Sequence, residues 1–232
     1  ALAGAILLGA RTGRFDKSGA AKPMKPFAAS SIPLVTVGVF ILWLGWFGFN
    51  GGSQLAMGTF DDAVAVSNIF INTNLAACGG VLAAAVMTRL LAGKTDVVQM
   101  LNGAIGGLVA ITAEPLAPAP IAAIFIGAIG GIIVVFGTKL LFNFKIDDVV
   151  GAVPAHLFAG IWGTLAVPLT NSDANFSAQL IGVLSINAFV FVVAYIVWAI
   201  MKNTMGIRLS KEAELKGTDV TETGVIAYAI RD

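Results

Sequence analysis

Charged residues are scarce in this sequence, where Asp, Glu, Lys and Arg make up only 12% of 232 residues. A soluble domain of this size carries about 25% charged residues. The hydrophobic fraction is 57%, and the mean hydropathy is +0.89. The shortage of charge excludes an ordinary soluble domain and predicts a chain whose main solvent is lipid.

Other absences narrow the function. A single cysteine, Cys78, excludes an intrachain disulfide, and its small neighbours indicate a packing role. The sequence contains no phosphate-binding loop, no cluster of metal ligands and no nucleophile–base pair, so we predict neither an enzyme nor a cofactor. The basic residues lie in loops without interleaved aromatic residues, which gives no support to nucleic-acid binding.

Long apolar runs are abundant instead. A membrane-spanning helix needs about 20 residues to cross about 30 Å of hydrocarbon. We therefore predict an all-α, polytopic transmembrane helix bundle. The predicted spans are 32–50, 63–87, 97–113, 121–141, 149–169 and 178–201.

Residues 1–10 are apolar but too few to cross a bilayer, which indicates the end of a helix that begins before Ala1. The predicted organisation has four parts. They are the end of a truncated helix at 1–10, a cytoplasmic loop at 11–31, a six-helix transmembrane region at 32–201 and a cytoplasmic C-terminal tail at 202–232.

Basic residues alternate between successive loops. All 14 Lys and Arg residues lie in the loop 11–31, near 89–94, near 139–145, or in the tail after residue 201. In the loops between them, the only charged residues are Asp and Glu. Because cytoplasmic loops are enriched in Lys and Arg, this alternation predicts a multi-pass protein of the inner (cytoplasmic) membrane with its C-terminus in the cytoplasm.

His156 is the only histidine, and it lies about 12 Å along the helix predicted for 149–169. An ionisable side chain at such depth is costly and marks a substrate or proton pathway by default. A lone histidine in a soluble protein is more often a satisfied core residue, so the lipid setting decides this interpretation.

Trp46, Phe49 and Ser53 follow one another at i, i+3 and i+7 and form one stripe of a predicted helix. Aromatic faces attract cations, and a hydroxyl oxygen accepts a hydrogen bond from an ammonium group. An aromatic belt at the membrane interface has the same composition. The residues alone leave both interpretations open.

Two further polar groups favour structural roles. Asp147 and Asp148 stand at the start of the His156 helix, where acids cap the N-terminus and complement the helix dipole. Asn68, Asn72, Thr73 and Asn74 form a polar strip that could bond to neighbouring helices.

Residues 45–53 (GWFGFNGGS) and 147–163 (DDVVGAVPAHLFAGIWG) resemble specific motifs of the ammonium transporter (Amt/Mep/Rh) family, in its bacterial Amt form. Residues 3–13 and 102–112 and the tail, with Gly224 and Tyr228, extend the resemblance over nearly the whole chain. It implies the second half of an eleven-helix subunit, from the end of the fifth helix, within a homotrimer whose subunits each contain a narrow hydrophobic pore.

The resemblance also implies roles for individual residues. His156 corresponds to the second of two stacked pore histidines, Phe49 to a gate phenylalanine, and Trp46 with Ser53 to the ammonium recruitment site. Thr112 and Ala152 correspond to the pore wall. The first histidine and the partner phenylalanine would precede Ala1. Gly151 and Val225 replace an Asp and a Glu of some members.

The implied function is movement of ammonium, with methylammonium as an analogue, as NH4+ or as NH3 plus a relayed proton. The implied partners are membrane lipid and, on the cytoplasmic face, a PII-type regulatory protein. Two alternatives within the family are an ammonium sensor and an Rh-like passive gas channel. The two specific motifs disfavour an unrelated secondary transporter.

Overall fold

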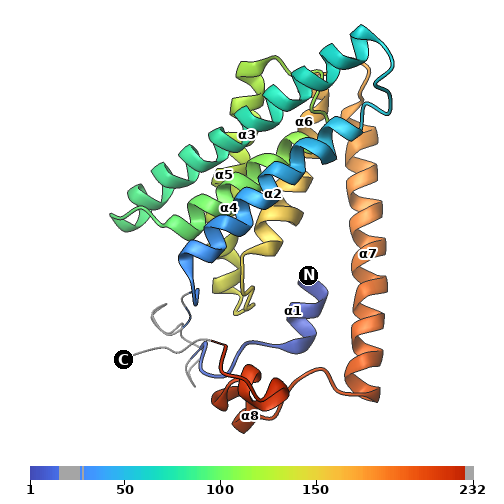
Figure 1. Cartoon of the computed structure of the whole chain (residues 1–232). Helices are drawn as coiled ribbons and strands as arrows, with labels where there is room; N and C mark the ends of the chain where they lie inside the picture. The colour runs from blue at the N-terminus through green and yellow to red at the C-terminus, as the bar shows by residue number, and fades with distance from the viewer. Residues whose placement is uncertain (16–26, 28, 228–232) are drawn as a thin grey trace.

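The computed structural model describes residues 1–15, 27 and 29–227, and this part of the chain is helical without a strand. In chain order, the elements are α1 (Leu2–Leu8), α2 (Ile32–Gly52), α3 (Phe60–Ala92), α4 (Val97–Thr112), α5 (Pro120–Asn143), η2 (Val153–Phe158), α6 (Ala159–Ala166), η3 (Val167–Leu169), α7 (Phe176–Thr204), α8 (Lys211–Lys216) and η4 (Asp219–Thr223). Figure 1 shows the arrangement of the α-helices. The all-α prediction is confirmed. Much of the loop 11–31, and the end of the tail with Tyr228, lie outside the described residues.

Local sequence signals set the helix ends. Ser31 caps α2 by accepting the Leu34 N–H. At the start of α3, Thr59 and Asp62 form a reciprocal capping box. Gly93 ends α3 in the left-handed conformation, with φ +70°, where glycine avoids the steric cost of a side chain.

Helices α3, α4 and α5 pack against one another nearly backbone to backbone. A Cβ added to Gly127 of α5 or Gly107 of α4 would collide with the carbonyl oxygen of Ala76 on α3. Likewise, a Cβ added to Gly80 of α3 would collide with the carbonyl oxygen of Gly103 on α4, and a Cβ added to Gly103 would collide with that of Gly80. Small residues permit this approach, which gives helices in lipid their packing contacts.

The remaining helices surround this core loosely (Figure 1). Helix α2 runs along α3 and α4, and α7 stands apart as a long helix that contacts α1 and α6. Large apolar side chains stay exposed, such as Leu44 on α2 at 71% and Phe189 on α7 at 70%. Such surfaces suit contact with lipid or with further protein rather than with water.

Within the described residues, α2, α3, α5 and α7 are long and apolar enough to cross a membrane. Helix α4 has 16 residues and spans about 24 Å, and the segment Val153–Leu169 is similarly short. Four of the six predicted crossings therefore correspond to helices long enough to span a membrane. Six full crossings remain a prediction.

The segment 149–169 was expected as one helix but is built in three pieces. Gly151, with φ +74°, turns the chain, and the helix starts only at Val153. It begins as the π-helix η2, continues as α6 and ends as the short 3-10 helix η3. Pro154 fits the first turn of η2 because it has no N–H to leave unpaired.

We expect Gly127→Ala to destabilise the protein by at least about 2 kcal/mol, because the added methyl group meets backbone that cannot rotate away. The matched control is Gly182→Ala on α7, where no atom lies within 4 Å of the added Cβ. That change should be neutral or slightly stabilising, since alanine favours helix. Unfolding of both purified variants in detergent gives the comparison, and equal stabilities would contradict the packing argument.

Candidate functional site

Three elements bring predicted site residues together around one aromatic side chain. Trp46 of α2 donates its indole N–H to Thr112 Oγ1, at the end of α4, over 2.8 Å. Its ring stacks against the imidazole of His156 on η2, with centroids 6.4 Å apart and planes 21° apart. Thr112 and His156, which follow Trp46 by 66 and 110 positions in the sequence, thus lie beside its ring.

The stripe on α2 continues from Trp46 toward the end of the helix. The rings of Trp46 and Phe49 meet edge to face at 6.1 Å, and Phe49 is 65% exposed. One turn further, the exposed Ser53 hydroxyl donates to the Phe49 carbonyl oxygen over 3.3 Å. Trp46 and Phe49 therefore contact each other on α2, and Trp46 is the member of this pair that lies beside His156.

His156 projects from a buried backbone. Val153, Pro154 and Ala155 just before it are buried, whereas the imidazole itself is exposed on this chain away from Trp46. Ala152 is half-buried and precedes η2 by one residue. One face of the imidazole is therefore covered by the Trp46 ring, and the opposite face is exposed on this chain.

Asp148 and Asn102 hold the start of η2. The Asp148 carboxylate accepts the N–H groups of Ala152 at 3.0 Å and Val153 at 2.7 Å. The Asn102 amide, on α4, donates to the Val150 carbonyl oxygen at 2.9 Å. Asn102 was not singled out from the sequence, although it is an amide inside an apolar run and begins the stretch 102–112 that resembles the family. Together these bonds fix the turn that sets the position of His156.

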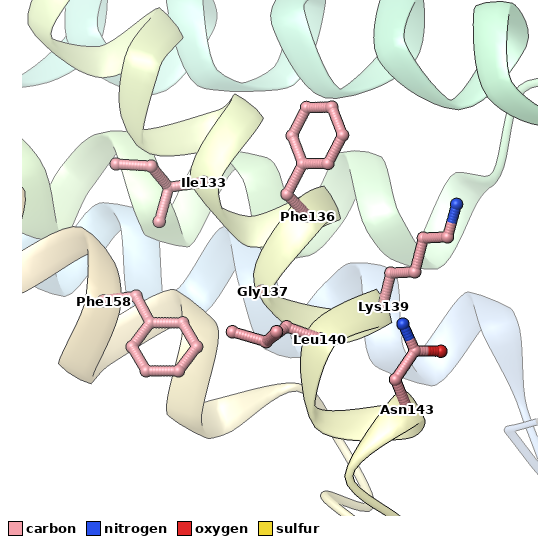
Figure 2. Close-up of a pocket in the computed structure, with 7 residues that line it drawn as sticks. All are labelled: Ile133, Phe136, Gly137, Lys139, Leu140, Asn143 and Phe158. Atoms are coloured by element: carbon pink, nitrogen blue, oxygen red, sulfur yellow. The ribbon is translucent and has the colours of Figure 1, made fainter.

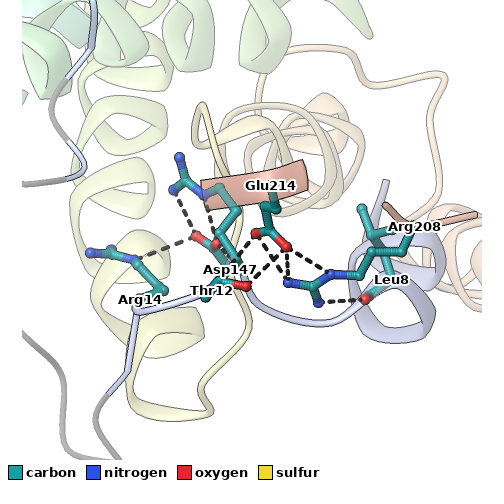
Figure 3. Close-up of polar contacts among 7 residues, drawn as sticks. Leu8, Thr12, Arg14, Asp147, Arg208 and Glu214 are labelled. Carbon is teal, nitrogen blue, oxygen red and sulfur yellow. Dashed lines mark hydrogen bonds and ion pairs between the residues drawn. The ribbon is translucent and has the colours of Figure 1, made fainter. Parts of the chain in front are cut away.

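Asp147 does not cap the helix but binds the segment after α1 (Figure 3). Arg11 donates to its carboxylate from Nε at 2.8 Å, from Nη2 at 2.9 Å and from the backbone N–H at 2.9 Å. Arg14 Nε lies 3.4 Å from the same carboxylate, and its guanidinium rests 4.9 Å over the ring of Phe142. The two neighbouring acids thus have different roles. Asp148 accepts the free N–H groups at the start of η2, and Asp147 binds Arg11.

Burial of Asp147 raises the pKa of its carboxyl, but the hydrogen bonds and charge of Arg11, with the charge of Arg14, outweigh that effect. The pKa therefore lies below the ordinary aspartate value, and the carboxylate stays ionised at neutral pH.

The C-terminal helix α8 binds the same segment through Glu214 (Figure 3). Glu214 accepts the Thr12 N–H at 2.7 Å and pairs with Arg208 Nη2 at 2.8 Å. Arg208 also donates to the Leu8 carbonyl oxygen at 3.1 Å. The hydrogen bond from Thr12, followed by that from Arg208, lowers the pKa of Glu214. Residues 8–14 therefore connect the tail with the loop that precedes η2.

The polar strip of α3 bonds in two directions. Thr73 Oγ1 accepts from the Asn50 amide of α2 at 2.9 Å. The Asn72 amide donates to the carbonyl oxygens of Pro115 and Pro118, at 3.0 and 2.8 Å. Asn68 and Asn74, which belonged to the predicted strip, are exposed.

A separate shallow groove lies between α5 and η2 (Figure 2). Its lining is mainly apolar, with Lys139 and Asn143 at one end, and includes Phe136 and Phe158. None of the predicted site residues lines it. Among the described residues, no three His, Cys, Asp or Glu side chains gather as a metal site.

Comparison with known proteins gives a consistent result. Residues 1–228 match the Ammonium Transporter Family. Ammonium transporter Amt2 of Archaeoglobus fulgidus is 37% identical over 98% of this chain and 52% of its own length. A putative ammonium transporter of Synechocystis is 38% identical over 97% of this chain and 51% of its own length.

Solved structures agree with these sequence relatives. A protein described as a sensor Amt protein superposes with a TM-score of 0.87 and 29% identity, over 95% of this chain and 56% of that chain. Mep2 of Candida albicans superposes with a TM-score of 0.75 and 26% identity, over 91% and 49%.

A polytopic helical membrane protein is thus defined by both the fold and the relatives. The chain belongs to the ammonium transporter family, whose named relatives are transporters rather than enzymes. It spans about half the length of the curated relatives it matches.

We expect Asp147→Asn to lower the free energy of unfolding by about 2 kcal/mol at pH 7, because charge-assisted hydrogen bonds from Arg11 are weakened. Since the folded-state pKa is depressed, the stabilisation is present above the ordinary aspartate pKa, about 4, and is lost as the pH falls through the folded-state value. The difference between variant and parent should therefore shrink on acidification.

Asp173→Asn, at an exposed position, is the matched control for the loss of one carboxylate. Unfolding in detergent measured from pH 7 down to pH 3 makes the comparison. A deficit in Asp147→Asn that stays constant down to pH 3 would contradict the linkage.

Proposed function

We propose that this chain forms one half of a pore that moves ammonium nitrogen across the cytoplasmic membrane. The observation that carries the proposal is the stacking of Trp46 on His156 in a family of ammonium transporters. An aromatic face and a group that can accept a proton lie side by side there, which supports a permeation path at this point.

The chemistry follows the order of residues on α2. An incoming NH4+ would meet the Ser53 hydroxyl and the faces of Trp46 and Phe49, where cation–π attraction compensates for lost water. A bare ion deeper in an apolar pore loses its hydration without full compensation. Passage as NH3 with a separately relayed proton avoids that cost, and His156 is the group that would accept the proton or a hydrogen bond. Thr112 and Ala152 would line the wall.

The open side of His156 is where a second half would complete the pore. The matched relatives are about twice as long as this chain. In the proposed protein the preceding half supplies a second histidine and the partner of Phe49. The segments 11–31 and 202–232 would face the cytoplasm, with 1–10 and 32–201 in the membrane.

Assembly and regulation extend the proposal. The large exposed apolar surfaces of α2 and α7 provide area for lipid and for a homotrimer. The ionic cluster of residues 8–14, Asp147 and α8 would lie on the cytoplasmic face, where a PII-type regulatory protein would dock.

An ammonium sensor is the second candidate, favoured by the close superposition on a sensor Amt protein. A passive gas channel of the Rh kind is distinguished by its electrical behaviour. Ammonium pulses would then change internal pH without carrying current.

We expect His156→Ala in the full-length protein to lower ammonium-induced current at least about tenfold, since the loss of one proton-relay or hydrogen-bonding group corresponds to about 1.4 kcal/mol or more. Methylammonium uptake and current should be recorded in parallel on the same membranes. Asn187→Ala on α7, which removes an amide bonded only to its own helix, serves as the control. Uptake and current that both remain at the parental level in His156→Ala would remove this histidine from the mechanism.

A further inference from the structure

We propose that Thr112 is a positioning residue whose hydroxyl fixes the indole of Trp46 against His156 and keeps the indole N–H out of the permeation path. The proposal rests on the transport function proposed above and deepens it.

The Thr112 hydroxyl donates one hydrogen bond and accepts another, and its partners show which is which. It donates its single proton to the Leu108 carbonyl oxygen, one turn back on α4, over 2.7 Å. A hydroxyl has one proton and two lone pairs, so the oxygen is then left as an acceptor. The Trp46 Nε1–H fills that position at 2.8 Å.

The Thr112 end of this bond is well held. Leu108 is fully buried, and Ile111 beside Thr112 is 1% exposed. Close glycine packing of α4 on α3 and α5 fixes the helix that carries the hydroxyl. Threonine adopts two χ1 rotamers in a helix, and the bond to the Leu108 carbonyl oxygen keeps Thr112 in one of them. The indole therefore has a fixed anchor on a rigid helix.

The anchor determines two aromatic contacts. The same indole ring stacks on His156 at 6.4 Å and meets Phe49 edge to face at 6.1 Å. A rotation that released the N–H from Thr112 would disturb both contacts. Thr112 thus acts on the path through Trp46, whose ring makes both contacts.

The bond also decides what the pore presents to its permeant. An indole N–H is a donor only, and an unpaired donor in an apolar site is costly. Freed from Thr112, it would donate to the lone pair of NH3 or to water and hold them there. With the N–H occupied, Trp46 offers only its π face, which attracts an N–H donor or a cation but does not trap a base.

The test uses the full-length protein with Thr112→Val and Thr112→Ser, each in the parent and in Trp46→Phe. Valine keeps the shape of threonine but removes the acceptor, whereas serine keeps the hydroxyl. Phenylalanine at 46 has no N–H to position. The readouts are the maximal rate and KM of methylammonium uptake, and the ultraviolet resonance Raman marker of indole N–H hydrogen bonding.

We expect Thr112→Val to lower uptake about fivefold or more and to shift the Raman marker toward a weaker hydrogen bond. Thr112→Ser should restore both to within about twofold of the parent. In the Trp46→Phe background, Thr112→Val should have no further effect, which separates positioning from general loss of structure. An equal loss in both backgrounds, or a Raman marker unchanged in Thr112→Val, overturns the proposal.

A failure of the transport function itself is distinguishable. A parent protein without uptake would reject the proposed function, whereas the Raman comparison would still decide whether Thr112 holds the indole.

Discussion

The close approach of α3, α4 and α5 is the constraint on which the rest of the structure depends. Glycines at each contact let the three backbones touch, and the carbonyl oxygen of Ala76 is met by both α4 and α5. Because α4 is fixed in this way, two of its polar side chains become fixed points. Asn102 holds the turn before η2, and Thr112 holds the indole beside His156. The rigid core thereby sets both ends of the candidate site.

Polar contacts around Asp147 and Asp148 extend this rigidity to residues 8–14 and to α8. Arg11 binds Asp147, Asp148 caps η2, and Glu214 of α8 binds Thr12. These contacts form a continuous line from the tail to the helix of His156. Helix α7 contacts the bundle through α6 and packs beside α1, so this polar cluster, which follows α1, also links the far end of α7 to the core.

Much of the fold could be predicted because lipid imposes simple rules. Runs of uncharged residues marked the long helices, and the limits predicted for α4 differ from the observed ones by one residue. The same rules failed at 149–169, where uniform hydropathy hid a turn at Gly151 and a change of helical period. Hydropathy records which solvent a residue prefers, and it does not record backbone geometry.

The candidate site was less predictable for a related reason. Spacing along one helix placed Trp46, Phe49 and Ser53 on one face, because that relation is local. The partners that lie far away in sequence carry no such signal. Asp147 and Asp148 are adjacent and chemically identical, yet one binds Arg11 and the other caps η2. Only the folded path of residues 8–14 distinguishes them.

The π-helical turn at His156 makes the register of this segment unusually sensitive to length. A wide turn holds one residue more than an α-helical turn of the same rise. Beyond it, Trp162 bonds the Ile126 carbonyl oxygen, and Gly163 rests on Ala110. Removing one residue between 153 and 158 would remove the wide turn, and the imidazole would then point in a different direction relative to those anchors, because the two helix types turn by different angles per residue. Chain length within this single turn, as much as residue identity, therefore aims the histidine.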